Sequence, residues 1–218
     1  MLLIFGAAGG IGSGLMDAAM SSSHLELMGV TREDCDFDKP ASVERFFSNT
    51  NRLGDPEKPL YCLNATGKLV NGTIANMSLA DLDFMIQSNV RANFLFLQNF
   101  IRAAKTRPGS CAVLLSSVVA RLGVVGAGAY GMCKAAQQGL VRTAAQEFAR
   151  YRVRANCVEM GYYDTGMINQ IPASHIDGIR DRIPLGRFGN CAELFDACAS
   201  ALLNPYMTGA TLTVSGGL

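Results

Sequence analysis

Tyr130 and Lys134 are the residues whose types and spacing best suit proton chemistry. They lie four positions apart in a helical pattern, so they share one face of the helix. A tyrosine with its ordinary pKa of about 10 is a weak acid or base at neutral pH, but a neighbouring ammonium favours the phenolate and lowers that pKa. The pair therefore predicts a general acid–base centre at Tyr130.

Ser117 lies thirteen residues before Tyr130, at the end of an apolar run. A serine hydroxyl in that place can hold a substrate oxygen and the charge that develops on it. Ser116 is the competing serine, and the spacing to Tyr130 favours Ser117. Many helices carry a Tyr–Lys pair as an ordinary solvated face, so the catalytic interpretation depends on Ser117 and on Asn89, which lies in a long amphipathic segment.

A glycine-rich turn follows the first apolar run, with glycines at Gly6, Gly10 and Gly12. Glycines let a backbone approach phosphate groups, and the helix that starts there offers free N–H groups and a positive dipole end. The turn therefore predicts a site for the pyrophosphate of a dinucleotide. A purely structural turn is the alternative that the glycines alone leave open.

Apolar runs alternate with longer helical patterns along the chain. The runs predicted as strands are 2–5, 25–30, 60–63, 112–115, 153–158 and 211–214. The helical patterns are 11–20, 40–48, 79–105, 129–151 and 192–203. This alternation predicts an α/β fold with a doubly wound parallel sheet (a Rossmann fold) of six strands, in one domain over residues 1–218. Residues 162–187 are rich in breakers and are predicted to be a mobile substrate loop of the same domain.

Several ordered motifs together resemble the short-chain dehydrogenase/reductase family, in the branch that contains the 3-oxoacyl carrier-protein reductases. They are the glycine spacing at 6, 10 and 12, Asn64-Ala65-Thr66-Gly67, Ser117 with the YxxxK of Tyr130 and Lys134, and the stretches 153–165, 184–189 and 208–217. The resemblance covers nearly the whole chain. It implies an NAD(P)-dependent oxidoreductase that moves a hydride between nicotinamide and a carbonyl or alcohol carbon, with Tyr130 as general acid or base.

The resemblance also implies roles for individual residues. Asn89, Ser117, Tyr130 and Lys134 are the expected catalytic set, with Asn89 supporting a water that links Lys134 to solvent. The expected cofactor-binding residues are Gly6, Ala8, Gly10, Ile11, Gly12, Thr31, Arg32, Asp36, Phe37, Asn64, Ala65, Lys134, Gly161 and Thr165.

The main departure from the family is a shortened region after the second predicted strand. Only a few residues separate Thr31 from Asp36-Phe37, which resembles the adenine-contacting segment that normally follows the third strand. We therefore expect that a helix and a strand are missing and that the second strand is at an edge of the sheet. A second departure is Phe5, which stands where the family commonly has a threonine and is expected to alter packing rather than chemistry.

The end of the second strand also bears on the choice of cofactor. An acidic residue in this position binds the adenosine ribose and repels a 2′-phosphate, but here the position holds Thr31, followed by Arg32. Arginine binds phosphate through paired, charge-assisted hydrogen bonds, so NADP(H) is favoured over NAD(H). Two alternatives remain: Arg32 is an ordinary surface residue, or Asp34 or Asp36 reads the ribose.

Composition narrows the other partners. A formal net charge of +1 gives no basic footprint for nucleic acid, and no apolar run is long enough to span a bilayer. The N-terminal residues lack the features of a signal peptide, and seven cysteines without CxxC pairs are typical of free thiols, so a cytoplasmic location is expected. No metal site is expected from two scattered histidines. The resemblance implies a homodimer or homotetramer through helices 79–105 and 129–151 and the C-terminal strand.

Three functions remain to be separated. The leading one is a reductase or dehydrogenase for a small or carrier-bound carbonyl. An epimerase or dehydratase would need a C-terminal substrate domain, for which the residues after 184–189 are too few. A non-catalytic regulator that senses dinucleotide would not need Ser117, Tyr130 and Lys134 together. The substrate itself is set by loops 120–127 and 162–187, whose sequences do not define a pocket shape.

Overall fold

The computed structural model describes residues 1–165, 168 and 173–218, with the backbone alone for 173–175. Its centre is one parallel sheet of six strands in the order β2-β1-β3-β4-β5-β6. The strands are β1 (Leu2–Phe5), β2 (Leu27–Val30), β3 (Tyr61–Asn64), β4 (Cys111–Ser117), β5 (Arg154–Met160) and β6 (Thr211–Val214). The order confirms the predicted fold, with β2 at an edge and no strand beyond it in the described chain.

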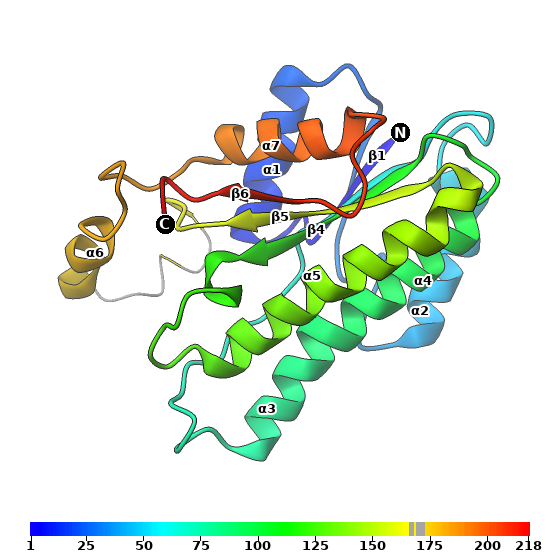
Figure 1. The fold of residues 1–218 in the computed structure, drawn as a ribbon. Coiled ribbons are helices and arrows are strands. Elements are labelled where there is room, and N and C mark those ends of the chain that lie inside the picture. Colours follow the sequence, from blue (N-terminus) through cyan, green and yellow to red (C-terminus); the bar gives the residue numbers. More distant parts are fainter. Residues whose placement is uncertain (166–167, 169–172) are drawn as a thin grey trace.

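Helices cover both faces of this sheet (Figure 1). On one face lie α1 (Gly10–Ser22) and α7 (Cys191–Leu203), and on the other α2 (Pro40–Ser48), α4 (Ala92–Ala104) and α5 (Gly128–Phe148). The remaining two are α3 (Leu79–Ile86), which leads into α4, and α6 (Ala173–Arg180). No helix in the described part of the chain is long and apolar enough to cross a membrane.

The side chains of β1 show why both faces need a covering layer. Leu3 and Phe5 belong to the core against α2, α4 and α5, while Leu2 and Ile4 belong to the core against α1 and α7. All four are at most 1% exposed. A strand that is apolar throughout is stable only between two helical layers, as the sequence predicted.

An aromatic cluster packs around Phe5 on the side of the sheet where the family's additional helix and strand were expected to be missing. The ring of Phe5 stacks on Phe47 at a centroid distance of 5.6 Å and meets Phe46 and Phe96 edge-on at 5.4 and 5.2 Å. Phe37, from the shortened connection, lies 5.9 Å from the same ring. Such pairs add stability beyond their buried area. Phe5 therefore does alter packing, because it joins β1 to α2, α4 and the segment after β2.

The structure differs from the sequence prediction in two elements. The helix predicted over 79–105 is interrupted by a π-helical turn (Gln87–Arg91) between α3 and α4. In addition, α6 lies inside the segment predicted to be a loop without secondary structure, 162–187. Residues 166, 167 and 169–172 of that segment lie outside the described residues, so its predicted mobility stays a prediction.

Candidate active site

The glycine turn joins the end of β1 to the start of α1. A Cβ atom on Gly12 would lie 2.0 Å from the carbonyl oxygen of Gly6, so no other residue fits there. Within the described chain no side chain caps this helix start, and the first turn of α1 holds no acidic residue. The free N–H groups and the positive end of the helix therefore suit an anionic group such as a pyrophosphate.

A cavity of about 350 Å³ lies beside this turn. Seven of the predicted cofactor-binding residues line it: Gly6, Ala8, Thr31, Arg32, Asp36, Phe37 and Ala65. Gly10, Ile11 and Gly12 form the adjoining first turn of α1. Lys68 and Ser88 also line the cavity, and neither was predicted from the sequence. The one feature of the sequence that could have indicated them is their position: Lys68 comes shortly after β3, and Ser88 directly precedes Asn89.

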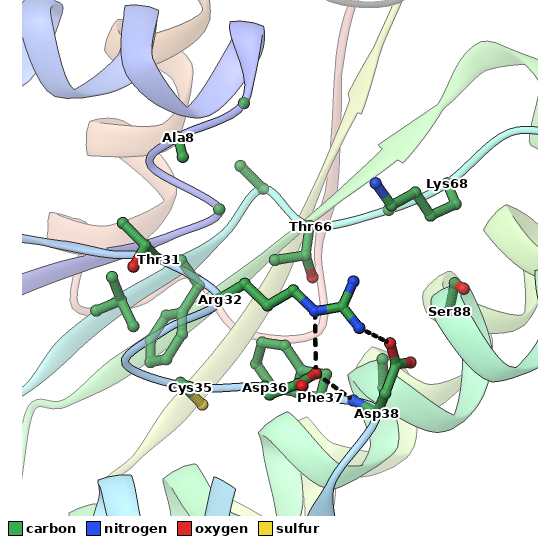
Figure 2. A pocket seen from close by; sticks show the side chains of 17 residues that line it. Ala8, Thr31, Arg32, Cys35, Asp36, Phe37, Asp38, Thr66, Lys68 and Ser88 are labelled. Carbon is green, nitrogen blue, oxygen red and sulfur yellow. Dashed lines mark hydrogen bonds and ion pairs between the residues drawn. The ribbon is translucent and has the colours of Figure 1, made fainter. Parts of the chain in front are cut away.

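Arg32 crosses the mouth of this cavity, and its side chain is 68% exposed (Figure 2). The guanidinium binds the carboxylate of Asp38 at 2.6 Å and lies 3.4 Å from that of Asp36. Asp36 is itself buried, and Lys39 lies 3.4 Å from its other oxygen. An exposed ion pair of this kind contributes little stability, so the guanidinium can exchange Asp38 for a ligand phosphate at small cost.

Asp34 is held on a different set of partners. Its carboxylate accepts hydrogen bonds from the backbone N–H and hydroxyl of Thr31, at 3.1 and 3.0 Å, and from Arg52 at 2.7 Å. The hydrogen bond from Arg52, followed by that from the Thr31 amide, lowers the pKa of Asp34. Asp34 is therefore a charged group that is already neutralised by Arg52 and not among the residues that line the cavity.

The two serines at the end of β4 have different surroundings. Ser116 is buried, and its hydroxyl donates to the backbone carbonyl of Lys134 at 3.0 Å. Ser117 is half-buried, and among the described residues its hydroxyl accepts a single long hydrogen bond, of 3.4 Å from the Val119 amide. Ser117 therefore retains a hydroxyl that can bind a substrate oxygen, which agrees with its preference over Ser116.

Tyr130 lies at the start of α5, beside the turn that follows Ser117. The approach is close, because a Cβ atom on Gly131 would come within 2.7 Å of the carbonyl oxygen of Val119. Lys134 is 3% exposed, and its Nζ lies 5.4 Å from the centroid of the Tyr130 ring. The fold thus brings Ser117, Tyr130 and Lys134 together at the carboxyl edge of the sheet.

The electrostatics of this pair correct one expectation. Burial raises the pKa of Tyr130, and Cys133 adds to the effect, so the predicted lowering by Lys134 is wrong for this structure. The reason is geometric: the Lys134 ammonium donates to the carbonyl oxygen of Leu115 at 2.7 Å and faces the ring rather than the hydroxyl. Burial also lowers the pKa of Lys134 to about 8, so Lys134 is charged in most molecules at neutral pH.

Asn89 lies in the π-helical turn and is completely buried. Its side-chain amide binds the backbone of Lys68 on both sides, donating to the carbonyl at 2.9 Å and accepting from the N–H at 3.2 Å. Its backbone carbonyl accepts from Asn93 at 2.7 Å and from Gln137 at 3.1 Å. The turn therefore directs a backbone carbonyl toward α5, next to Lys134.

Three more predicted residues lie at the ends of central strands. Asn64 is 1% exposed and donates to Asn93 at 2.9 Å, so it ties β3 to α4. Gly161 and Thr165 follow β5, and the Gly161 amide donates to the carbonyl of Val214 at 3.0 Å. Ligands of doubly wound sheets bind along the carboxyl edge, where β3, β4 and β5 end at Asn64, Ser117 and Met160.

The sequence matches a known family over most of its length. The family described as Enoyl-(Acyl carrier protein) reductase matches residues 17–218. The 3-oxoacyl-[acyl-carrier-protein] reductase of Homo sapiens is 30% identical over 185 residues, which cover 84% of this chain and 76% of that protein. The (3R)-3-hydroxyacyl-CoA dehydrogenase of Rattus norvegicus is 32% identical over 163 residues, covering 73% of this chain and 63% of that protein.

Solved structures share the fold. A small-chain dehydrogenase in complex with NADPH superposes with a TM-score of 0.86 at 20% identity, covering 99% of this chain and 96% of that one. A short-chain dehydrogenase/reductase from Serratia marcescens superposes with a TM-score of 0.83 at 23% identity, with the same coverage.

Proposed function

Because this chain belongs to the short-chain dehydrogenase/reductase family, we propose that it moves a hydride between a nicotinamide dinucleotide and a carbonyl or alcohol carbon, with Tyr130 giving or taking the proton. The observation that carries the proposal is the meeting of Ser117, Tyr130 and Lys134 at the same sheet edge as the glycine turn and its cavity. A structural turn or a solvated Tyr–Lys face does not account for that arrangement.

The residues divide the work between them. Bound nicotinamide supplies the hydride chemistry. The glycine turn would hold the pyrophosphate of the cofactor. Arg32 and Thr31 would bind the adenosine ribose, and Asp36 and Phe37 would contact the adenine. Ser117 holds the substrate oxygen, Tyr130 exchanges a proton with it, and Lys134 binds the nicotinamide ribose beside the Tyr130 ring. Asn89 links Lys134 to solvent by way of a water, as the family resemblance implies.

The substrate class follows from the relatives. Two of them are named for reactions of 3-oxoacyl and 3-hydroxyacyl groups on a carrier protein or on coenzyme A. We therefore propose a small or carrier-bound carbonyl as the substrate. A panel of 3-oxoacyl thioesters, ketones and alcohols, tested with NADPH and NADH, examines this directly. Dinucleotide that binds without turnover of any of these compounds would instead support the non-catalytic regulator.

We expect a moderate preference for NADPH that Arg32→Ala largely abolishes. The substitution removes the cation that faces the 2′-phosphate, and kcat/KM with NADPH should fall about tenfold while the value with NADH changes little. Both constants are measured for native and variant protein. Arg45→Ala is the matched control, because Arg45 is exposed on α2 and is not among the residues that line the cavity. If the native protein prefers NADH, the residue that binds the adenosine ribose would be Asp36 or Asp34 instead of Arg32.

We propose that the protein is a homodimer or homotetramer through the outer faces of α3, α4 and α5. Large apolar side chains are exposed along these helices, namely Leu79, Phe84, Ile86, Phe94 and Met132. We expect Phe94→Glu, in α4, to shift the molecular mass in solution toward the monomer, since an unpaired charge in an apolar interface is costly. Light scattering after size exclusion measures the mass, and an unchanged mass would place the interface elsewhere. Tyr206→Glu, 98% exposed after α7, is the control.

We propose a cytoplasmic location, which the cysteines support. All seven are free thiols, and six of them are buried. Buried thiols without disulfide partners are typical of proteins in a reducing compartment.

A further inference from the structure

The amide of Gln137 connects the two elements that carry Lys134 and Asn89. Gln137 lies one helical turn after Lys134 on α5 and is 1% exposed. Its Nε2 donates to the backbone carbonyl of Asn89 at 3.1 Å, and its Oε1 accepts from the Lys134 ammonium at 3.4 Å. Gln137 was not predicted from the sequence, because the sequence does not distinguish a buried glutamine in a helix from a surface one.

The hydrogen-bond partners fix which way this amide points. A backbone carbonyl can only accept, so Gln137 must present Nε2 to Asn89 and Oε1 to Lys134. The same logic extends further: Asn93 donates to the Asn89 carbonyl at 2.7 Å and accepts from Asn64 at 2.9 Å. Asn64 in turn accepts from the hydroxyl of Thr66 at 2.7 Å, on the wall of the cofactor cavity. A single polar chain therefore runs from that wall to Lys134, and its orientation is unique.

Few other groups compensate the buried charge of Lys134. Within the described residues no carboxylate pairs with it, and its hydrogen-bond acceptors there are the oxygens of Leu115 and Gln137. The titratable groups around it are Tyr130 and Cys133 on α5 and Cys157 on β5. Burial raises the pKa of all three, so they stay neutral near pH 7 and supply no opposite charge. A buried ammonium with so few partners depends on each of them.

We propose that Gln137 is a positioning residue for the reaction: its amide bridges the Lys134 ammonium and the backbone carbonyl of Asn89 in the π-helical turn, and it supplies one of the oxygens that the charged form of Lys134 needs. The proposal rests on the proposed function, because Lys134 matters for turnover only if it serves Tyr130 and the ribose. Gln137 touches neither the substrate nor the cofactor in this assignment, and it acts through Lys134.

Two substitutions of Gln137 separate this role from simple packing. Gln137→Met keeps the shape but removes the oxygen, so the pKa of Lys134 should fall. The alkaline limb of kcat/KM should move to lower pH, and a pKa lower by about one unit reduces the charged fraction at pH 8 about fivefold. Gln137→Glu keeps an oxygen toward the ammonium in either protonation state, so it should not move the limb to lower pH.

The experiment measures the pKa of Lys134 directly by NMR of protein labelled with [13C]lysine, with Lys134→Met to assign the signal. It also records the pH profile of kcat/KM and the unfolding temperature of each variant. Gln138→Met is the matched control, because the neighbouring amide binds Glu159 at 2.9 Å and Ser116 at 3.4 Å rather than Lys134. We expect this control to leave the pKa of Lys134 unchanged.

The outcomes are distinct. An unchanged pKa of Lys134 in Gln137→Met, or an equal fall in Gln137→Glu or Gln138→Met, would overturn the proposal. If Gln137→Met does not fold, Gln137→Glu decides the matter: a lower pKa of Lys134 in Gln137→Glu would overturn the proposal, and an unlowered pKa would support it. If the native protein turns over no carbonyl or alcohol, the proposed function fails, while the NMR titration still decides whether Gln137 sustains the charge on Lys134.

Discussion

Tyr130→Phe should retain cofactor binding and lose at least about 100-fold in turnover, because general acid–base catalysis contributes on this scale. The substitution removes one hydroxyl and leaves the ring over Lys134, whose Nζ lies 5.4 Å from the ring centroid. Burial raises the pKa of this hydroxyl, so the free protein holds Tyr130 in its protonated form over a wide pH range. Steady-state kinetics and calorimetric titration with NADPH measure the two effects separately.

The control for this variant is Tyr151→Phe, in the short 3₁₀ turn after α5, where the ring packs against Arg150 with its guanidinium carbon 4.7 Å from the ring centroid. That variant should keep native turnover. Near-native turnover of Tyr130→Phe itself would remove Tyr130 from its assigned role and leave the proton to another group.

Lys134→Met should weaken cofactor binding and turnover together. One ammonium is assigned both to the nicotinamide ribose and to Tyr130, and a hydrogen bond to a charged group is worth about 1.5–3 kcal/mol, or roughly ten- to hundredfold in affinity. The protein should still fold, since replacing a buried charge by an apolar side chain of similar length often leaves stability unchanged. The Kd for NADPH and the kcat are measured on the same preparation.

Lys105→Met, on the exposed end of α4, is the control for removing a lysine without touching the site. An affinity for NADPH that does not change in Lys134→Met would show that the ribose contact was assigned to the wrong residue. The role toward Tyr130 would then be tested by kcat alone.

Local patterns predicted most of the fold. The apolar run at β1 and the helix at Pro40–Ser48 have the predicted bounds, because a strand buried on both faces and an amphipathic helix leave direct traces in residue type. The β6 strand also has the predicted bounds, although its residues are exposed or half-buried. The π-helical turn at Gln87–Arg91 left no such trace, since one extra residue in a helix barely disturbs the apolar spacing. The α6 helix was obscured by the glycines and prolines around it.

The sequence predicted which residues form the candidate site, but it did not predict their pKa values. Spacing placed Ser117, Tyr130 and Lys134 on neighbouring elements, and the structure brings them together. The pKa of Tyr130 depends instead on burial and on where the Lys134 ammonium points, and both are properties of the assembled fold. The same is true of Gln137, whose partner across the site is 48 residues earlier in the chain.

The edge position of β2 bears on the tendency of this chain to aggregate. An edge strand presents unpaired N–H and C=O groups, and a long, flat edge is a template for aggregation. β2 has only four residues, with Gly29 among them, so it offers a short and weakly specified ladder to an incoming strand. A variant that lengthened β2 to restore a fuller sheet would also extend that template. A designer who reuses this compact scaffold should therefore keep the edge short or add charged residues to it.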